Sequence, residues 1–141
     1  MMLGESHLGT LLSSLQPRLQ SGEFVFCTVP PGAVLPPELT PICQFYEEEG
    51  LTLILPRAQA EAAQMACAYP ARLITLTVHS DLAAVGFLAA ITGRLAAHGI
   101  SVNAVSAYYH DHLFVPTEHA NTALRVLQEL SLEAQKHNSI A

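Results

Sequence analysis

Apolar residues recur along the first half of the chain at two spacings, and each spacing predicts a different element. Residues 6–16 place leucines three and four positions apart, as an amphipathic helix does. Residues 23–29 are rich in β-branched and aromatic side chains and predict a strand, and the five prolines of 30–41 predict a loop after it. Residues 42–55 have the pattern of a strand, an acidic turn and a second strand, and Pro56 opens an alanine-rich helix.

The second half of the chain again changes between the spacing of a strand and that of a helix. Residues 72–80 alternate as a strand does, and 81–99 return to helical spacing. A strand over 100–109 follows, and the stretch 108–116, with the sequence YYHDHLFVP, carries a turn and another strand. Thr117 is expected to cap a final helix, which predicts the order strand, helix, strand, strand, helix.

The helix predicted over 81–99 has recognisable ends. Ser80 or Asp81 is expected to cap its start, and Gly99 stands at the position after a helix end that favours glycine. Its predicted buried stripe follows the spacing of one helix face: Val85, Leu88, Ala89, Thr92, Leu95 and Ala96.

The two halves share one pattern. Tyr46 precedes a polar turn, an apolar strand, Pro56 and an alanine-rich helix, and Tyr109 precedes the same series up to Pro116 with a shorter turn. This indicates an internal repeat of about 65 residues with a boundary near 68–71. We therefore expect an α+β chain of two tandem halves, 1–67 and 68–141, each with an antiparallel sheet and helices on one face, of the split βαβ type.

The charge of the chain argues against a nucleic acid as its partner. The formal net charge is -6, and the six Lys and Arg residues are spread singly, so no basic patch is available to neutralise the phosphates of a nucleic acid. Only 13% of the residues are charged, which favours burial of some surface against another subunit, and a homodimer is expected. No apolar run reaches the length of a membrane span, and no signal peptide is recognised at the N-terminus.

The cysteines indicate a reducing compartment. Cys27, Cys43 and Cys67 are odd in number and lack CxxC spacing, which argues against a disulfide framework and a zinc ribbon. They are predicted to be reduced thiols in a cytoplasmic protein, most simply as small buried hydrophobic residues.

The second half resembles the ACT domain, a ferredoxin-like ligand-binding module with the βαββαβ order. The resemblance lies in Gly86-Phe87-Leu88-Ala89, which opens a helix after a strand, and in Gly99-Ile100, which enters the next strand. The whole chain is similar to small tandem ACT-like proteins without assigned biochemistry. The resemblance implies ferredoxin-like halves that bind an amino acid or a similar small ligand and regulate metabolic enzymes. It also implies that subunits pair with their sheets side by side and hold the ligand at the subunit interface.

The resemblance also implies where the ligand binds. The family's binding residues lie after the first strand, at the helix start and on the neighbouring strand. In this chain those positions are His79, Ser80, Asp81, Gly86, Phe87, Ser101 and Asn103. The loop before Gly86 is longer than in the family, and Ser101 stands where the family often has asparagine.

General physical chemistry favours the same place. The first N–H groups of a helix lack partners and attract a carboxylate. Gly86 would let a ligand approach the backbone closely, and Asp81 or Asn103 could accept a hydrogen bond from an ammonium group. The plainer interpretation is that Ser80 and Asp81 only cap the helix and that Gly86 only lets it pack.

The HDH sequence at 110–112 offers a different chemistry. His110 and His112 are two positions apart and share a face if they lie on a strand, so they could form part of a metal site. Zinc needs further ligands with supporting partners. The first interpretation of the stretch is a hairpin turn, equivalent to the turn that holds the glutamates 47–49. The histidines could also pair with those glutamates across a contact between halves or subunits.

Three hypotheses for the function follow. The first is a regulatory protein of the ACT type that binds an amino acid without a cofactor, is not an enzyme, and acts through a homodimer or a partner. The second is a metal-dependent enzyme or metal-binding protein built on His110, Asp111 and His112. The third is a structural module that joins its sheet to a partner.

Overall fold

The computed structural model describes residues 7–140, and residues 139 and 140 by their backbone only. The chain forms two compact units. The second unit is Ser21–Arg72, and it is inserted into the first, which joins the segment ending at Gln20 to the segment beginning at Leu73. The predicted boundary between 67 and 68 follows the sequence repeat, whereas the compact units follow contacts, so that boundary stays a prediction.

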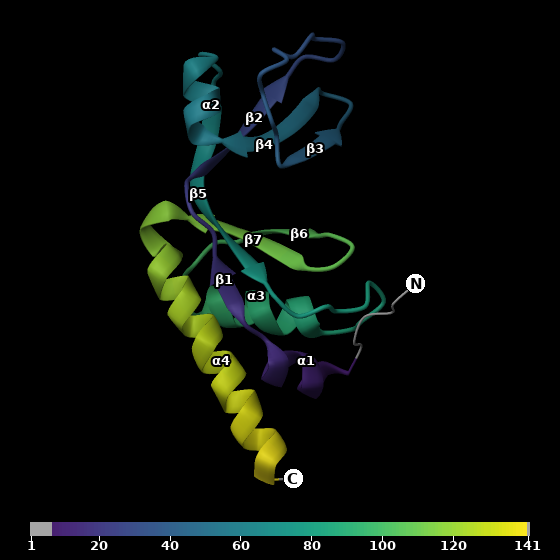
Figure 1. Ribbon diagram of the computed structural model, residues 1–141, viewed down its shortest axis with the longest axis vertical. Helices are drawn as coiled ribbons and strands as arrows, with labels where there is room; N and C mark the ends of the chain where they lie inside the picture. The colour runs from purple at the N-terminus through teal and green to yellow at the C-terminus, as the bar shows by residue number, and fades with distance from the viewer. Residues whose placement is uncertain (1–6, 141) are drawn as a thin grey trace. The chain divides into compact units, whose positions relative to one another are not determined.

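The inserted unit consists of four strands and one helix (Figure 1). Strand β2 (Phe24–Val29) pairs antiparallel with β4 (Leu51–Pro56), which in turn pairs antiparallel with β3 (Cys43–Tyr46). Helix α2 (Arg57–Ala62) leads from β4 into β5 (Cys67–Leu76), whose first part pairs with β2. The order β3-β4-β2-β5 with antiparallel neighbours is that of a ferredoxin-like sheet, in which a loop over 30–42 takes the place of the first helix.

The outer unit has a similar antiparallel arrangement with more helices, but its edge strand β1 comes before the other strands in the chain rather than after them. Its strands are β1 (Pro17–Leu19), the last part of β5, β7 (Asp111–Pro116) and β6 (Asn103–Ser106), in the order β1-β5-β7-β6. Its helices are α1 (Leu8–Ser14), α3 (Phe87–Ala97), the 3₁₀ turn η1 (Thr117–His119) and α4 (Ala120–Ile140). Strand β5 is therefore the last strand of the inserted unit and, after β1, the second strand of the outer unit.

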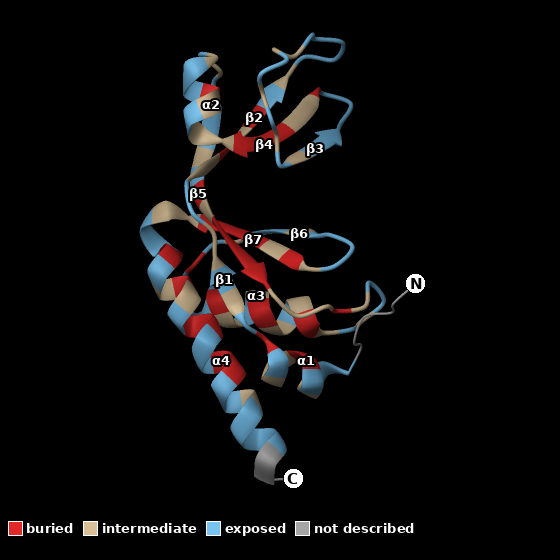
Figure 2. Ribbon diagram, viewed as in Figure 1, coloured by how far each residue is buried: buried red, intermediate tan, exposed pale blue. Residues whose placement is uncertain are grey.

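One apolar core holds the outer unit together (Figure 2). Leu76 of β5 and Leu113 of β7 pack with Leu11 of α1, Ile91 of α3 and Leu127 of α4. Each of these five side chains is fully buried, and burial of such a side chain is worth about 1.5–3 kcal/mol. The helices therefore cover one face of this sheet, as the sequence predicts. None of the helices in the described part of the chain combines the length and the apolar character needed to cross a membrane.

The end of α3 confirms the role predicted for Gly99. This glycine has φ +71, its N–H donates to the carbonyl of Ala96 at 2.9 Å, and the N–H of Ile100 donates to the carbonyl of Leu95 at 3.1 Å. These two bonds form a Schellman motif, and the buried Leu95 and Ile100 supply its usual apolar contact.

The start of α3 corrects the prediction that Ser80 or Asp81 caps the helix. The helix begins at Phe87, because Gly86 precedes it with φ +92, which no helix accommodates. The carboxylate of Asp81 instead accepts the N–H of Ala83 at 2.7 Å and forms a local turn. The buried face of α3 consists of Phe87, Ile91 and Leu95, with Leu88 packed against the core beside them. The predicted stripe was therefore right at Leu95, partly right at Leu88, and wrong at the exposed Val85, Ala89 and Ala96.

The remaining boundaries differ by a few residues for local reasons. Strand β5 begins at Cys67 rather than at 72, since its first residues pair with β2 although they lack apolar alternation. Strand β1 was not predicted, because three residues beginning with a proline carry no periodic signal. The helix predicted from residue 6 begins at Leu8, and the predicted start itself lies outside the described residues.

The internal repeat is confirmed in its architecture and corrected in its register. Pro56 and Pro116 each end a six-residue strand and precede a helical element, with backbone angles of -55° and 132° at the first and -53° and 139° at the second. Counting back from the prolines aligns Tyr46 with Ser106, since the pairs Tyr46–Leu51 and Ser106–Asp111 occupy the same register. The two turns are therefore equal in length, and the glutamates at 47–49 correspond to 107–109 rather than to HDH.

Candidate ligand-binding site

A small cavity lies in the outer unit where the segment after β5 reaches the start of α3. Its volume is about 170 Å³. The lining comes from three places: the segment before α3, the first turn of α3, and the β6–β7 hairpin. The residues are Ser80, Asp81, Leu82, Ala84, Phe87, Leu88, Ser106, Ala107 and Asp111.

Asp111 is the chemical centre of this cavity. It is the first residue of β7, and only 7% of its surface is exposed. Ser106 donates a hydrogen bond to one carboxylate oxygen at 2.5 Å, and the buried Ser80 donates to the other at 3.3 Å. These two bonds hold the carboxylate in place from β6 and from the segment after β5.

The cavity has an acidic character. Asp81 and Asp111 are the two aspartates of the sequence, and both line this one cavity. No lysine, arginine or histidine is among the lining residues. A carboxylate can accept about four hydrogen bonds, so Asp111 keeps capacity beyond its two serine donors. A buried carboxylate without a cationic partner favours a ligand that carries positive charge.

The start of α3 favours negative charge on a ligand, whereas Asp111 favours positive charge. Gly86 is the N-cap residue, and no side chain caps this end of the helix. Phe87 and Leu88, the first residues of the 11-residue helix, line the cavity. The first N–H groups of a helix and its dipole favour an anionic group. The cavity therefore offers a cation site at Asp111 and an anion site at the helix start.

The structure gathers some of the predicted ligand-binding residues and leaves others apart. Ser80, Asp81 and Phe87 line the cavity. Gly86 does not line the cavity. A Cβ at this position would meet the side chain of Leu8 at 3.6 Å. The glycine is therefore explained by its positive φ rather than by the close approach of a ligand. Ligand binding by the other three predicted residues stays a prediction about positions outside this cavity: His79, Ser101 and Asn103.

His79 belongs to an aromatic cluster of the same unit. Its ring lies 5.3 Å from that of Tyr109 and 6.4 Å from that of Tyr108, and the two tyrosine rings are 4.9 Å apart. Both tyrosines are exposed, at 47% for Tyr108 and 61% for Tyr109. His79 directly precedes Ser80, and Tyr108 and Tyr109 follow Ala107. The three rings form an aromatic surface beside the segments that line the cavity.

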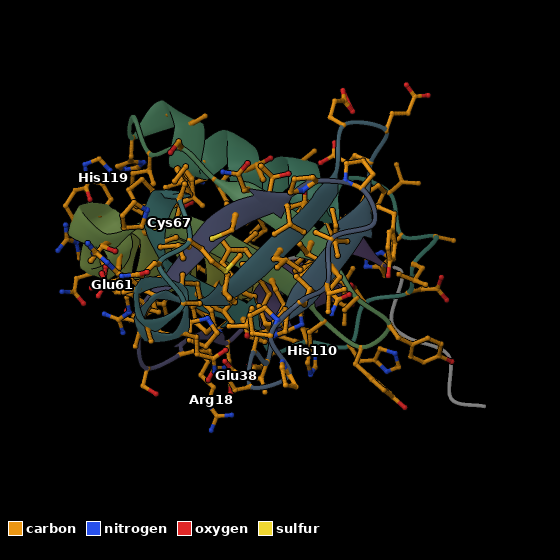
Figure 3. The ribbon with its side chains drawn as sticks, turned by 90° about the horizontal axis from the view of Figure 1, so that it is seen from above. Arg18, Glu38, Glu61, Cys67, His110 and His119 are labelled. Atoms are coloured by element: carbon orange, nitrogen blue, oxygen red, sulfur yellow. The ribbon has the colours of Figure 1, made fainter. Side chains whose placement is uncertain are left out.

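HDH is not the turn that the sequence suggested. The turn is closed by the N–H of Ala107 and the carbonyl of His110, and Asp111 and His112 already belong to β7. The rings of His110 and His112 lie 6.4 Å apart, while Asp111 alternates to the cavity face (Figure 3 labels His110). Within residues 7–138, no group of three or more His, Cys, Asp and Glu side chains could hold a metal ion.

His112 lies in a polar contact on the sheet. Its Nδ1 is 3.0 Å from the hydroxyl of Thr75, which also accepts from the side-chain amide of Gln20 at 3.2 Å. Burial lowers the pKa of His112 below its ordinary value, the charge of His110 lowers it further, and Asp111 opposes this. The neutral imidazole is therefore the form that the fold favours.

We expect the outer unit to lose stability as the pH falls through the window below the ordinary histidine value of about 6.5. In this window the unfolded chain binds a proton at His112 that the folded chain does not. The free energy of unfolding therefore decreases as the pH decreases. His112→Gln should lessen this loss, which urea unfolding at pH 7 and pH 5 would measure. Parallel pH profiles for the variant and the wild type would contradict the expectation.

The inserted unit has a cavity at the equivalent place, with different chemistry. It measures about 450 Å³ and is lined by the loop after β2 and by the β3–β4 hairpin. Leu51 occupies the position of Asp111, and Tyr46 occupies that of Ser106. Glu47 is its one acidic residue, and that carboxylate already accepts the hydroxyl of Thr52. The buried carboxylate is therefore particular to the outer unit.

Sequence reasoning did not place Ser106 or Asp111 at this cavity. Asp111 was assigned to a turn and weighed only as part of a metal site. Two signals in the sequence could have found it. One is the scarcity of aspartate, and the other is the register counted back from Pro116, which makes Asp111 the first residue of a six-residue strand.

Comparison with known proteins agrees with the fold. Models of the ACT domain match residues 3–72 and residues 68–129. A crystal structure of a Vibrio cholerae protein of unknown function, described as a possible transport protein, is 47% identical over 88% of this chain and 95% of that one, with a TM-score of 0.79. No curated protein matches the chain.

More distant structures share the fold alone. An Agrobacterium tumefaciens protein is 13% identical, with a TM-score of 0.68 over 83% of this chain and 89% of its own. The regulatory subunit of aspartate kinase from Thermus thermophilus is 11% identical, with a TM-score of 0.57 over 81% of this chain and 95% of its own. Two models of the ACT domain match the chain, and each compact unit contains a ferredoxin-like sheet. The chain therefore belongs to the ACT domain family and carries two ACT domains in tandem.

Proposed function

We propose that this chain is a regulatory protein that binds an amino acid in the cavity at the start of α3. The observation that supports this most is the meeting of both aspartates of the chain, with Ser80 and Ser106, around one small cavity. The volume of about 170 Å³ is below the usual range for drug-sized ligands and suits a small molecule.

The two ends of an amino acid suit the two polarities of the cavity. Its ammonium group would donate to Asp111, which is held by Ser80 and Ser106, in a charge-assisted hydrogen bond. Its carboxylate would lie against the first N–H groups of α3, where the helix dipole favours negative charge. The side chain of the ligand would then extend toward the opening, beside the exposed rings of Tyr108 and Tyr109.

Thermal unfolding of the full chain with each of the twenty amino acids tests this proposal. A ligand present at about 100 times its dissociation constant adds roughly 2.7 kcal/mol and moves Tm by several degrees. We expect a shift from one or a few amino acids, unchanged by a chelator. A flat panel would contradict amino-acid binding, and a Tm that falls with the chelator alone would favour a metal site instead.

Analogues of the responding amino acid separate the two halves of the proposed contact. The analogue that lacks the ammonium group should give no shift, because its carboxylate would remain while nothing on the ligand carried positive charge toward Asp111. The amine that lacks the carboxylate should give a smaller shift than the amino acid. Equal shifts from the amino acid and from its deaminated analogue would contradict the role of Asp111.

Asp81 gives a second and milder test of the same cavity. Its side chain orders the turn before α3 through the N–H of Ala83, and it adds negative charge at the cavity. Asp81→Ala is expected to weaken or abolish the response to the amino acid, whereas His110→Ala is expected to retain it. Loss of the response in His110→Ala alone, with Asp81→Ala unaffected, would contradict this site.

We infer that binding is transmitted through assembly rather than through chemistry on the ligand. The regulatory subunit of aspartate kinase shares the fold, and a chain of this composition suits a subunit contact. A homodimer whose association depends on the amino acid is the simplest arrangement, because a ligand shifts an equilibrium only by its differential affinity for the two states. Sedimentation velocity with and without the amino acid would show a change in the dimer fraction, and a monomer under both conditions would contradict it.

A further inference from the structure

Two cysteines of the inserted unit lie directly opposite each other on neighbouring strands. Cys27 of β2 and Cys67 of β5 are Cα partners in an antiparallel pair. Residues paired in this way have Cα atoms about 4.5–5.5 Å apart, with both side chains on one face of the sheet. That spacing lies inside the range of about 4.4–6.8 Å that a disulfide spans.

The two thiols differ in their surroundings. Cys27 is 4% exposed and packs in the core of the inserted unit with Val25 and Leu53, whereas Cys67 is exposed (Figure 3 labels Cys67). Burial raises the pKa of the Cys27 thiol, and the charge of Cys67 and a hydrogen bond with its thiol raise it further. The sulfur atoms are therefore near enough to interact, with one of them open to solvent.

We propose that Cys27 and Cys67 form a redox modification site, which a hydroperoxide converts from two thiols into one disulfide across β2 and β5. This goes beyond ligand binding, because the pair belongs to the inserted unit and does not line the cavity of the outer unit.

The chemistry balances in two steps. The Cys67 thiolate attacks one oxygen of the hydroperoxide, the O–O bond breaks, and the departing oxygen takes a proton and leaves as water or an alcohol. The resulting sulfenic acid is then attacked by the sulfur of Cys27, so that the S–S bond forms, the S–O bond breaks, and a second water carries away the oxygen and the proton of Cys27. Two thiols have lost two electrons and two protons to the peroxide, and a reducing thiol reverses the change.

The third cysteine provides a matched control within the same sheet. Cys43 is paired with Ile54 of β4, whereas Cys27 is paired with Leu53, so Cys43 projects from the opposite face and is separated from Cys27 by one intervening strand. Cys43→Ser should therefore leave the reaction of the pair unchanged.

The experiment treats the folded full chain with hydrogen peroxide and counts free thiols after denaturation. We expect the count to fall from three to one, with peptide mapping that identifies the Cys27–Cys67 link, and with Tm raised by several degrees because the link closes a loop of about 40 residues. Dithiothreitol should restore all three thiols and the original Tm. Cys43→Ser should show the same loss of two thiols.

Cys67→Ala is the primary variant, because this exposed position tolerates substitution without disturbing the core. It should keep Cys27 and Cys43 as free thiols after the same peroxide treatment and should show no rise in Tm. Retention of three thiols by the oxidised wild type, a disulfide that contains Cys43, or a Cys27–Cys67 link that forms only in urea would overturn the proposal.

Discussion

Asp111→Asn should reduce the thermal shift that the responding amino acid gives to the wild-type chain to about half or less at the same ligand concentration. The substitution keeps the shape of the side chain and can keep both serine partners, since a serine hydroxyl accepts as well as donates. It removes the negative charge that the ammonium group is proposed to contact. Hydrogen bonds to charged groups are worth about 1.5–3 kcal/mol, so affinity should fall roughly 10- to 100-fold.

Glu118→Gln is the matched control for the loss of one negative charge. Glu118 is exposed in η1, beyond the other end of β7 from Asp111. This variant should keep the wild-type affinity, measured by calorimetric titration. A similar loss of affinity in both variants would show that net charge rather than the Asp111 contact governs binding, and an unchanged affinity in Asp111→Asn would contradict the site.

Gly50→Ala should destabilise the inserted unit more than any other small substitution in its hairpin. A Cβ at this position would overlap the carbonyl oxygen of Val29 and approach the hydroxyl of Thr28 at 3.0 Å. The oxygen belongs to the backbone of β2, which pairs with β4 at this point, so it cannot move without breaking the pairing. We expect a cost of about 3 kcal/mol, the upper part of the range for overpacking, in reversible urea unfolding.

Gly93→Ala should have the opposite sign. Gly93 lies inside α3, and a Cβ there would meet nothing within 4 Å. Alanine should therefore stabilise the helix by roughly 0.5–1 kcal/mol, because glycine loses more backbone entropy there. Destabilisation of both variants by similar amounts would contradict the view that the contact with Val29, rather than substitution of glycine as such, sets the cost at Gly50.

The sequence predicted those parts of the fold that carry a local signal. Pro56, Pro116 and Gly99 act through backbone preferences that depend little on context. The runs at 23–29 and 42–55 are rich in the residues that suit a half-buried sheet. Strand β1 and the start of β5 could not be predicted, since their pairing joins residues far apart in sequence. The start of α3 was placed six residues too early because Asp81 resembles an N-cap, while the left-handed Gly86 decides the boundary.

The candidate site was predicted in part. Ser80, Asp81 and Phe87 came from the resemblance to ACT domains and lie at the cavity. Ser106 and Asp111 were missed because the repeat was aligned on tyrosines rather than on the prolines, which shifted the second hairpin by three residues. Asp111 was therefore placed in a turn rather than at the start of β7.

The most direct measurement is an NMR titration of the full ¹⁵N-labelled chain with the amino acid that raises Tm most. We expect saturable shifts of the backbone amides at 80–89 and 106–111, which surround the cavity of the outer unit. In Asp111→Asn we expect the same shifts to need roughly 10- to 100-fold more ligand. Saturable shifts confined to 29–35 and 46–51 would place the ligand in the cavity of the inserted unit and contradict the proposed site.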